Sequence, residues 1–270
     1  MVWRLLDTGP GRAVYNMALD EAILALHARG LAPPTLRFYT WRPVAVSLGR
    51  HQDVREVVSI EDCQRLGIEV VRRPTGGWAV LHDGDLTFSI IASHALLGTG
   101  SVMAAYRQLA SGIVAGLGNL GLTGTLVNRD GEDKGKSALC FAVKRGSDIA
   151  VGDAKLVGSA QVRRQRAVLQ QNDLPLRPHD ARCAAVFRDE SAREALLRSS
   201  NLEGLLCRPV RIEEVKHAVV TGFEMALGAT FETGNLSPEE QHLCAGCTGY
   251  NPVPPGGRHG GTGFQPVRSR

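Results

Sequence analysis

The sequence predicts an α+β fold, in which strands and helices occupy separate parts of the chain instead of alternating as repeated βαβ units. Short apolar runs separated by turn glycines predict a strand meander within 138–173, whereas apolar residues at helical spacing predict long helices over 101–120 and 212–227. The 270 residues are 43% hydrophobic and 21% charged, which is enough apolar material for the core of one large domain or two.

The first seventy residues mix short strands with helices. A strand is predicted over 3–6, and a helix with one buried face is predicted over 16–28, with Asn16 as its N-cap. Asp20 and Glu21 fall in the first turns of this helix, where carboxylates suit the helix dipole, and we expect both to be surface charge. There follow strands over 36–39, 44–48 and 68–71 and a short helix over 60–66, ended by Gly67.

The stretch 72–89 (RRPTGGWAVLHDGDLTFS) has the composition of a ligand site. We expect a hairpin-like unit, with a strand over 78–81, a turn at 82–84 and a second strand over 86–91. Its polar groups would then gather at the ends of the two strands.

Two pairs of residues at the start of this stretch suit ligand binding. Gly76 and Gly77 allow backbone N–H groups to approach a ligand closely. Arg72 and Arg73 add fixed positive charge suited to a carboxylate or a phosphate. The simpler alternative is an ordinary glycine turn between two strands with a basic rim.

The second half of the chain begins with a charged, glycine-rich segment over 128–137, which we expect to be a mobile surface loop. Ser237 and Glu240 form a capping box at the start of a last helix. We expect a catalytic domain over 1–248 and a disordered Pro/Gly/Arg-rich tail over 249–270. Between the loop and the last helix, strands are predicted over 139–143, 148–151, 155–163 and 167–170, and helices over 191–198 and 212–227.

Cys140 and Lys155 are the candidates for covalent chemistry. Cys140 starts a predicted strand just after the charged loop, and Lys155 is one of only five lysines in the chain. Two or three short strands separate them, so they could face each other across a pocket. A cysteine beside an ammonium group has a lowered pKa and is a better nucleophile. Taken separately, a small buried hydrophobe and a solvated strand lysine are the alternatives.

The segment 158–161 also suits a ligand. Gly158, Ser159 and Ala160 are small and Gln161 adds an amide, which leaves room for an extended ligand chain; tight packing of sheet against helix is the alternative. Neither Ser159 nor Ser89 has a recognisable His/Asp arrangement around it, which argues against a serine hydrolase. No P-loop motif is present.

Composition argues against several classes of function. The net charge of +4 and pI of about 8.8 are mildly basic, which suits an acidic protein partner but not nucleic acid. No apolar run is long enough to span a bilayer and no signal-peptide pattern is found, so we expect a cytoplasmic protein. Cys244 and Cys247 form a lone CxxC without a second ligand pair, so no metal site is expected.

Four segments taken together resemble the biotin/lipoate A/B protein ligase family. They are NMALDEAIL (16–24), RRPTGGWAVLHDGDLTFS (72–89), Cys140-Phe141 and GDAKLVGSAQVRRQRAVLQ (152–170), and their order and spacing also match across roughly residues 1–245. The resemblance implies an α+β catalytic domain of the biotin/lipoate-protein ligase type, with mixed sheets packed with helices and a pocket for a medium-length acyl chain. Within the family, the sequence is most similar to the cysteine-dependent octanoyltransferases (the LipM type).

That branch implies that Cys140 carries the acyl group as a thioester and that Lys155 lowers the pKa of its thiol. The implied reaction moves octanoate from acyl carrier protein to a lysine of a lipoyl domain or of the glycine-cleavage H protein, in a monomer that needs no ATP or other cofactor. Backbone N–H groups near Gly76-Gly77 or Gly158 could complete an oxyanion site, and His82 is a candidate general base or a hydrogen-bonding turn residue. The substrate would contact Arg72, Arg73, Thr75, Gly76, Gly77, His82, Gly158, Ser159, Ala160 and Gln161.

Three other functions remain open: an ATP-dependent lipoate-protein ligase, an octanoyl amidotransferase between H protein and lipoyl domains, and a non-catalytic acyl-binding protein. Trp78 stands where a family ligase commonly has a third small residue, and it would crowd a nucleotide. Residues 170–173 (QQND) replace the family's frequent Gln-His-Gly-Ser/Thr, and 142–147 lack its usual aromatic residues. These departures concern the acyl pocket and leave Cys140 and Lys155 untouched.

Overall fold

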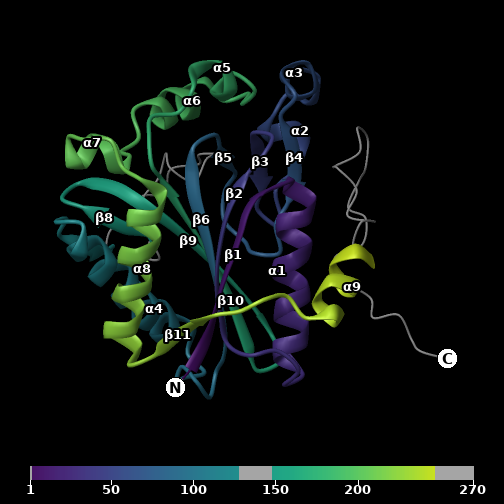
Figure 1. The fold of residues 1–270 in the computed structure, drawn as a ribbon. Helices are drawn as coiled ribbons and strands as arrows, with labels where there is room; N and C mark the ends of the chain where they lie inside the picture. The colour runs from purple at the N-terminus through teal and green to yellow at the C-terminus, as the bar shows by residue number, and fades with distance from the viewer. Residues whose placement is uncertain (1, 128–147, 247–270) are drawn as a thin grey trace.

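The computed structural model describes residues 2–127 and 148–246 and contains two sheets with helices packed around them (Figure 1). The strands of the larger sheet are β1 (Val2–Gly11), β2 (Thr35–Trp41), β6 (Asp85–Ser93), β7 (Gly124–Leu126), β8 (Ile149–Val151), β9 (Ala154–Arg164), β10 (Ala167–Pro175) and β11 (Thr230–Thr233). Their order is β11-β1-β2-β6-β10-β9-β8-β7. β1 is parallel to both of its neighbours and all other pairs are antiparallel, so the sheet is mixed.

Two pairs of helices cover the two faces of this sheet (Figure 1). α1 (Ala13–Ala28) packs with α9 (Pro238–Gly246) on one face, and α4 (Val102–Asn119) packs with α8 (Ile212–Leu227) on the other. The alternation along β6 explains this arrangement: Phe88 and Ile90 belong to the core beneath α4 and α8, whereas Ile91 belongs to the core beneath α1. α4 and α8 approach closely at Gly222, where an added Cβ would lie 2.3 Å from the Gly112 carbonyl oxygen.

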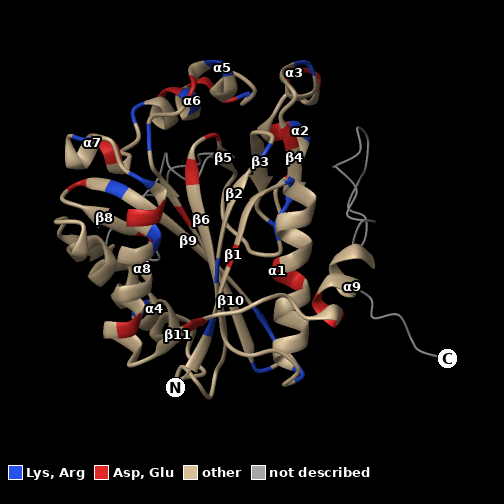
Figure 2. Cartoon of the chain, viewed as in Figure 1, with Lys and Arg blue, Asp and Glu red and all other residues tan. Residues whose placement is uncertain are grey.

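The smaller sheet has the order β4-β3-β5 and forms a second core with short helices. Its strands are β3 (Ala45–Leu48), β4 (Glu69–Arg72) and β5 (Val80–His82), and the helices are α2 (Val54–Val57), α3 (Ile60–Leu66), α5 (Ala181–Ala184) and α6 (Glu190–Leu197). α7 (Leu202–Leu206) lies between this unit and α8 along the chain. Figure 2 shows charged residues gathered on these short helices. The chain therefore leaves the large sheet after β2 and returns to it at β6.

The structure confirms the α+β class and most of the predicted elements. α4 and α8 fall within one residue of their predicted bounds, and α3 ends at Gly67, which has a left-handed φ of 66°. The capping box at α9 is formed: the Glu240 backbone N–H donates to Ser237 Oγ at 3.1 Å, and the Ser237 N–H donates to Glu240 Oε2 at 2.8 Å. No helix among the described residues is long and apolar enough to cross a membrane.

The predicted hairpin over 72–89 is wrong. β5 pairs with β3 in the smaller sheet, and β6 pairs with β2 and β10 in the larger one. The turn at 82–84 therefore joins two sheets instead of two paired strands. Local periodicity could not reveal this, because pairing partners are chosen by tertiary contacts.

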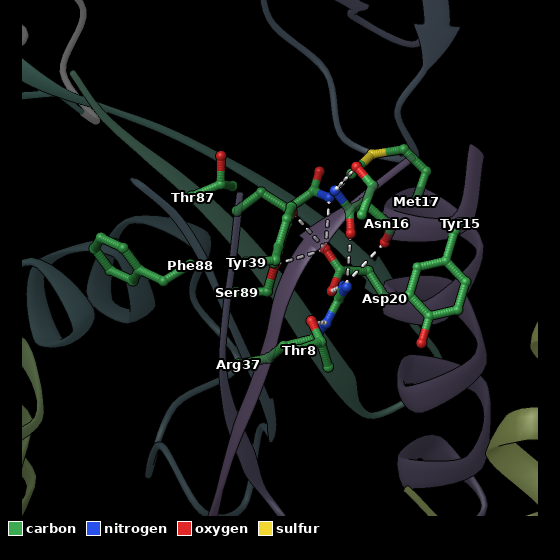
Figure 3. Close-up of polar contacts among 12 residues, drawn as sticks. Thr8, Tyr15, Asn16, Met17, Asp20, Arg37, Tyr39, Thr87, Phe88 and Ser89 are labelled. Atoms are coloured by element: carbon green, nitrogen blue, oxygen red, sulfur yellow. Dashed lines mark hydrogen bonds and ion pairs between the residues drawn. The ribbon is translucent and has the colours of Figure 1, made fainter. Parts of the chain in front are cut away.

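The two expectations for the start of the first helix are also wrong. The helix begins at Ala13, and Asn16 lies inside it, where its Nδ2 donates to the carbonyl of Thr40 at 3.0 Å. Asp20 and Glu21 are buried, not surface charge. Asp20 forms an ion pair with Arg37 at 2.7 Å in which both side chains are fully buried (Figure 3). The β11 strand was not predicted, because its side chains are mostly exposed and carry little pattern.

Several predictions fall on residues that the structure does not describe. These are Cys140, the surface loop at 128–137, the strand at 139–143 and the tail at 249–270.

We expect Asp20→Ala to lower the free energy of unfolding by about 3–5 kcal/mol, because the Arg37 charge would stay buried without its carboxylate. Urea denaturation of the purified protein measures this. Asp62→Ala, which breaks an exposed pair with Arg65, is the matched control and should leave the denaturation midpoint unchanged. A loss for Asp20→Ala of less than about 1 kcal/mol, as for an exposed ion pair, would contradict a supporting role for the buried pair.

Candidate functional site

A pocket of about 220 Å³ lies between the two sheets and the start of α4. It receives residues from β2, β3, β5, β6, β9 and β10, and from the loop that precedes β5. Its lining comprises Met17, Tyr39, Trp41, Ser47, Arg73, Gly76, Gly77, Trp78, Val80, His82, Thr87, Tyr106, Asp148, Gly158, Ser159, Ala160, Gln161, Gln171, Asn172 and Asp173. Most of the residues predicted from the sequence therefore meet at one place.

One wall of the pocket is the glycine loop at 74–77, and the Arg73 side chain holds this loop in place through hydrogen bonds to backbone carbonyls. The Arg73 Nη1 donates to the Ser47 carbonyl at 2.9 Å, and its Nη2 donates to the carbonyls of Gly76 at 2.8 Å and Trp78 at 2.7 Å. Arg73 is 6% exposed. These hydrogen bonds fix the conformation of the loop. They also place the positive charge of Arg73 at the pocket wall.

Arg72 does not line the pocket. Its Nη1 donates to three carbonyls of the neighbouring turn, those of Gly49, Arg50 and Gln52, at 2.8–3.1 Å. This turn and the glycine loop touch through their backbones, since a Cβ added at Gly49 would lie 1.9 Å from the Gly77 carbonyl oxygen. Gly77 itself has a φ of 89°, which favours glycine. Arg72 therefore stabilises the turn at 49–52, and Arg73 stabilises the adjacent glycine loop.

The opposite wall is the segment 158–161 of β9. Its small residues Gly158 and Ala160 line the pocket. Ser159 Oγ donates to Asn172 Oδ1 at 2.8 Å, and Gln161 Nε2 donates to Gln170 Oε1 at 2.6 Å, so the polar side chains of this wall are tied to β10.

Lys155 lies on the same strand and is buried. Its Nζ lies 2.8 Å from Asp148 Oδ2, and Asp148 lines the pocket. Both side chains are at most 4% exposed, so the pair is held away from solvent. A buried ammonium beside the pocket supplies localised positive charge for an anionic group formed there. Cys140 lies outside the described residues.

His82 stands at the end of β5 inside a buried polar cluster. Its Nδ1 donates to Asp85 Oδ2 at 2.8 Å and lies 3.3 Å from Asp173 Oδ1. Its Nε2 pairs with Ser47 Oγ at 2.8 Å, and its ring stacks on Trp41 with centroids 3.9 Å apart. The ring is therefore fixed on both edges and on one face.

The charges of this cluster shift one another's pKa values. Burial alone would lower the pKa of His82, but the two carboxylates outweigh it and raise the pKa to about 9. Burial favours the neutral form of Asp85, yet the His82 charge and hydrogen bonds hold its pKa below the usual range. Burial and then the Asp85 charge raise the pKa of Asp173 well above its usual range.

Among the described residues, only His82, Asp85 and Asp173 lie close enough together to be considered as three ligands of one metal ion. Hydrogen bonds already occupy both nitrogens of His82 and the Asp85 oxygen that faces it. We therefore interpret the cluster as a hydrogen-bonded group of ionisable side chains that can bind and release protons, and we assign no metal ion to it.

A second buried polar cluster, centred on Asp20 (Figure 3), adjoins the pocket through Tyr39 and Gln171, which line it. Asp20 Oδ2 accepts hydrogen bonds from Tyr39 Oη at 3.0 Å, Ser89 Oγ at 2.6 Å and Gln171 Nε2 at 2.8 Å. Thr75 Oγ1 then donates to Gln171 Oε1 at 2.8 Å. A continuous series of bonds thus runs from α1 through β10 to the glycine loop. Thr75 is fully buried, and its hydroxyl is used to position the wall.

The site residues predicted from the sequence leave out much of the pocket lining, including Trp41, Tyr106, Asp148 and Asp173. The two aromatic residues look like ordinary core positions in the sequence. The two acids lie in predicted or observed strands, where buried carboxylates are rare. The sequence offers one signal for Asp173. Four polar residues follow one another at 170–173, and the structure shows that all of them lie in a fully buried strand.

In architecture, the protein has the fold of the lipoate-protein ligases. It resembles the crystal structure of a lipoate-protein ligase A bound with ATP, with a TM-score of 0.76 and 31% identity, covering 91% of this chain and 94% of that chain. It equally resembles a lipoic acid-bound protein from T. acidophilum, described as a putative lipoate protein ligase, with a TM-score of 0.76, 29% identity and the same coverages.

Sequence comparisons give the family. The model of the lipoyl protein ligase A/B catalytic domain matches residues 12–224. The octanoyltransferase LipM of Kyrpidia tusciae is 40% identical over 252 residues, covering 88% of this chain and 92% of that protein. The octanoyltransferase LipM of Symbiobacterium thermophilum is 37% identical over 254 residues, covering 88% and 91%. The chain belongs to the lipoyl protein ligase A/B catalytic domain family.

We expect the His82 imidazole to titrate with a midpoint near 9 in the folded protein, as measured by side-chain NMR with assignment by loss of the signal in His82→Gln. Because this pKa lies above the unfolded value of about 6.5, the pairing stabilises the fold fully below pH 6.5. That contribution is lost as the pH rises from 6.5 through 9. A midpoint at or below 6.5 would show that the two carboxylates do not control the ring.

Proposed function

We propose that the protein is an octanoyltransferase of protein lipoylation, which transfers octanoate from octanoyl-acyl carrier protein through a Cys140 thioester to a lysine of a lipoyl domain or glycine-cleavage H protein. The observation that carries this proposal is the 40% identity over 88% of the chain to a protein named octanoyltransferase LipM. The pocket supports it, because small strand residues face an open space beside the buried Lys155–Asp148 pair.

The chemistry needs no nucleotide. The Cys140 thiolate attacks the octanoyl thioester, and exchange of one thioester for another is nearly isoenergetic. The acceptor lysine then attacks the acyl-enzyme and forms an amide, which is downhill. In this scheme Lys155 stabilises negative charge on the sulfur and on the carbonyl oxygen. Residues 158–161 hold the acyl chain, and the backbone at Gly76-Gly77 faces them across the pocket.

An ATP-dependent lipoate-protein ligase is the second candidate, because a solved structure of similar fold is a lipoate-protein ligase A bound with ATP. Trp78 lines the pocket directly after the glycine pair. Its indole is much larger than the small residue that a family ligase commonly has at this place, and this favours direct transfer over adenylate formation. Activity that depends on ATP and free lipoate would support the ligase instead.

We expect intact-mass analysis to detect one octanoyl group on the protein after mixing with octanoyl-acyl carrier protein in the absence of ATP. Cys140→Ala should abolish this adduct, because the thioester requires the thiol. Cys207→Ala removes an exposed cysteine and is the matched control, which should keep the adduct.

Three outcomes would redirect the proposal. Failure of the wild type to form any adduct would overturn the covalent mechanism. Full transfer by Cys140→Ala to a lipoyl domain would do the same. Octanoyl-H protein serving as donor in place of the carrier would identify an octanoyl amidotransferase, and binding of octanoate without any transfer would indicate an acyl-binding protein.

A further inference from the structure

The structure points to a second chemical end of the pocket. We propose that Asp173, held by the His82–Asp85 pair, receives the ammonium group of the acceptor lysine and takes the proton that must leave before the amine can attack the acyl group. This inference rests on the proposed octanoyltransferase function and names a residue that acts in its second step only.

Asp173 is a buried carboxylate with an unused oxygen. The residue is 5% exposed and lines the pocket. Its Oδ1 lies 3.3 Å from His82 Nδ1, but within the described part of the chain its Oδ2 has no hydrogen-bond partner. A buried polar atom without a partner costs about 1–3 kcal/mol, and more when it is charged. A donor that arrives with the substrate would remove that cost.

The polar groups around Asp173 are bonded mainly to one another, and its contact with Asp85 sets two carboxyl groups side by side. His82 Nδ1 is closer to Asp85, at 2.8 Å, and its Nε2 pairs with Ser47. Thr87 Oγ1 donates to Asp85 Oδ2 at 2.8 Å and lies 3.5 Å from Asp173 Oδ1. Two carboxylates therefore share one imidazole, which leaves one negative charge in excess whenever both are ionised.

The unpaired Asp173 Oδ2 indicates which chemical class of ligand would bind there. An acyl chain gains nothing beside a carboxylate, and a thioester has no hydrogen to donate. A primary ammonium carries both positive charge and N–H donors, and its hydrogen bonds to a carboxylate are among the stronger ones in proteins. The acceptor lysine is the one such group that the proposed reaction brings into the pocket.

Strand register places this oxygen beside the acyl wall. Asp173 pairs with Gly158 across β10 and β9, and Lys155 lies three residues before Gly158 on the same strand. The Asp173 carboxylate and Asp148 thus line one pocket, and Lys155 is held beside that pocket by its ion pair with Asp148. An amine held at Asp173 would lie near an acyl group stabilised by Lys155, which is the proximity that amide formation requires.

The proton balance of the second step is simple. The lysine ammonium gives one proton to the Asp173 carboxylate, and the neutral amine forms a C–N bond with the thioester carbon. The C–S bond breaks as the intermediate transfers its second N–H proton to the departing sulfur, which restores the Cys140 thiol. Asp173 then releases its proton to solvent. Burial and the Asp85 charge raise the pKa of Asp173, which makes its carboxylate a stronger base than that of an ordinary aspartate.

The test separates the two half-reactions with the full-length protein. Octanoyl-enzyme is prepared with octanoyl-acyl carrier protein, and its single-turnover loss to a lipoyl-domain acceptor is followed by intact mass. For Asp173→Asn we expect acyl-enzyme formation at the wild-type rate and amide formation slowed by about 100-fold or more, the usual effect of removing a general base. Asp173→Ser, with a smaller uncharged side chain, should behave in the same way.

Two controls keep the result specific. Hydroxylamine is a neutral nucleophile at pH 7 and should deacylate wild type and Asp173→Asn equally, because it needs no base. Asp189→Asn, a conservative change at the N-cap of α6, should leave both steps unchanged.

The outcomes are distinguishable. If wild type forms no acyl-enzyme, the proposed function itself fails. If acyl-enzyme forms and Asp173→Asn transfers it to the acceptor at the wild-type rate, only this inference fails. Equal slowing of hydroxylamine and of the lipoyl domain would mean that Asp173 only shapes the pocket, and it would also overturn the inference.

Discussion

The buried Asp20–Arg37 ion pair is the constraint on which the site depends. Removing two charges from water is costly, and their attraction offsets that cost only when the remaining hydrogen-bonding groups are also satisfied. The protein meets this condition: Arg37 also donates to the backbone carbonyl of Asn16 at 2.9 Å and to Thr8 Oγ1 at 3.1 Å, and Asp20 accepts bonds from β2, β6 and β10. One carboxylate on α1 therefore fixes the relative positions of three strands that supply the pocket.

The same network explains why the glycine loop can be both open and well defined. Its residues have little side chain with which to hold themselves in place. The bond from Thr75 to Gln171, and the Arg73 contacts to its carbonyls, attach the loop to the two sheets. The loop's shape is therefore set by the buried side chain of Thr75 within it and by those of Arg73 and Gln171 outside it.

The sequence predicted the elements well and their partners poorly. Helical periodicity located α4 and α8, and the capping box at Ser237 and Glu240 formed as expected, because these signals are local. β5 and β6 were assigned to one hairpin, since nothing within 72–89 encodes that β5 pairs with β3. The combination of motifs located eight of the twenty residues that line the pocket. The buried acids Asp20 and Asp173 were not recognised as buried, because burial of a charge depends on partners distant in sequence.

The position of the acids gives the pocket two chemically different ends. Near the base of β9, the Lys155–Asp148 pair offers positive charge where a thiolate or an oxyanion would need it. Near the end of β10, Asp173 beside His82 offers negative charge where an ammonium would need it. By strand register Asp173 lies opposite Gly158, three residues along β9 from Lys155, and Ala160 lies one step further, opposite Gln171. Because both ends are buried, each charge acts over a short distance with little screening by water. In the proposed reaction, a pocket with this polarity would hold a neutral acyl group near both a stabilising cation and an approaching amine.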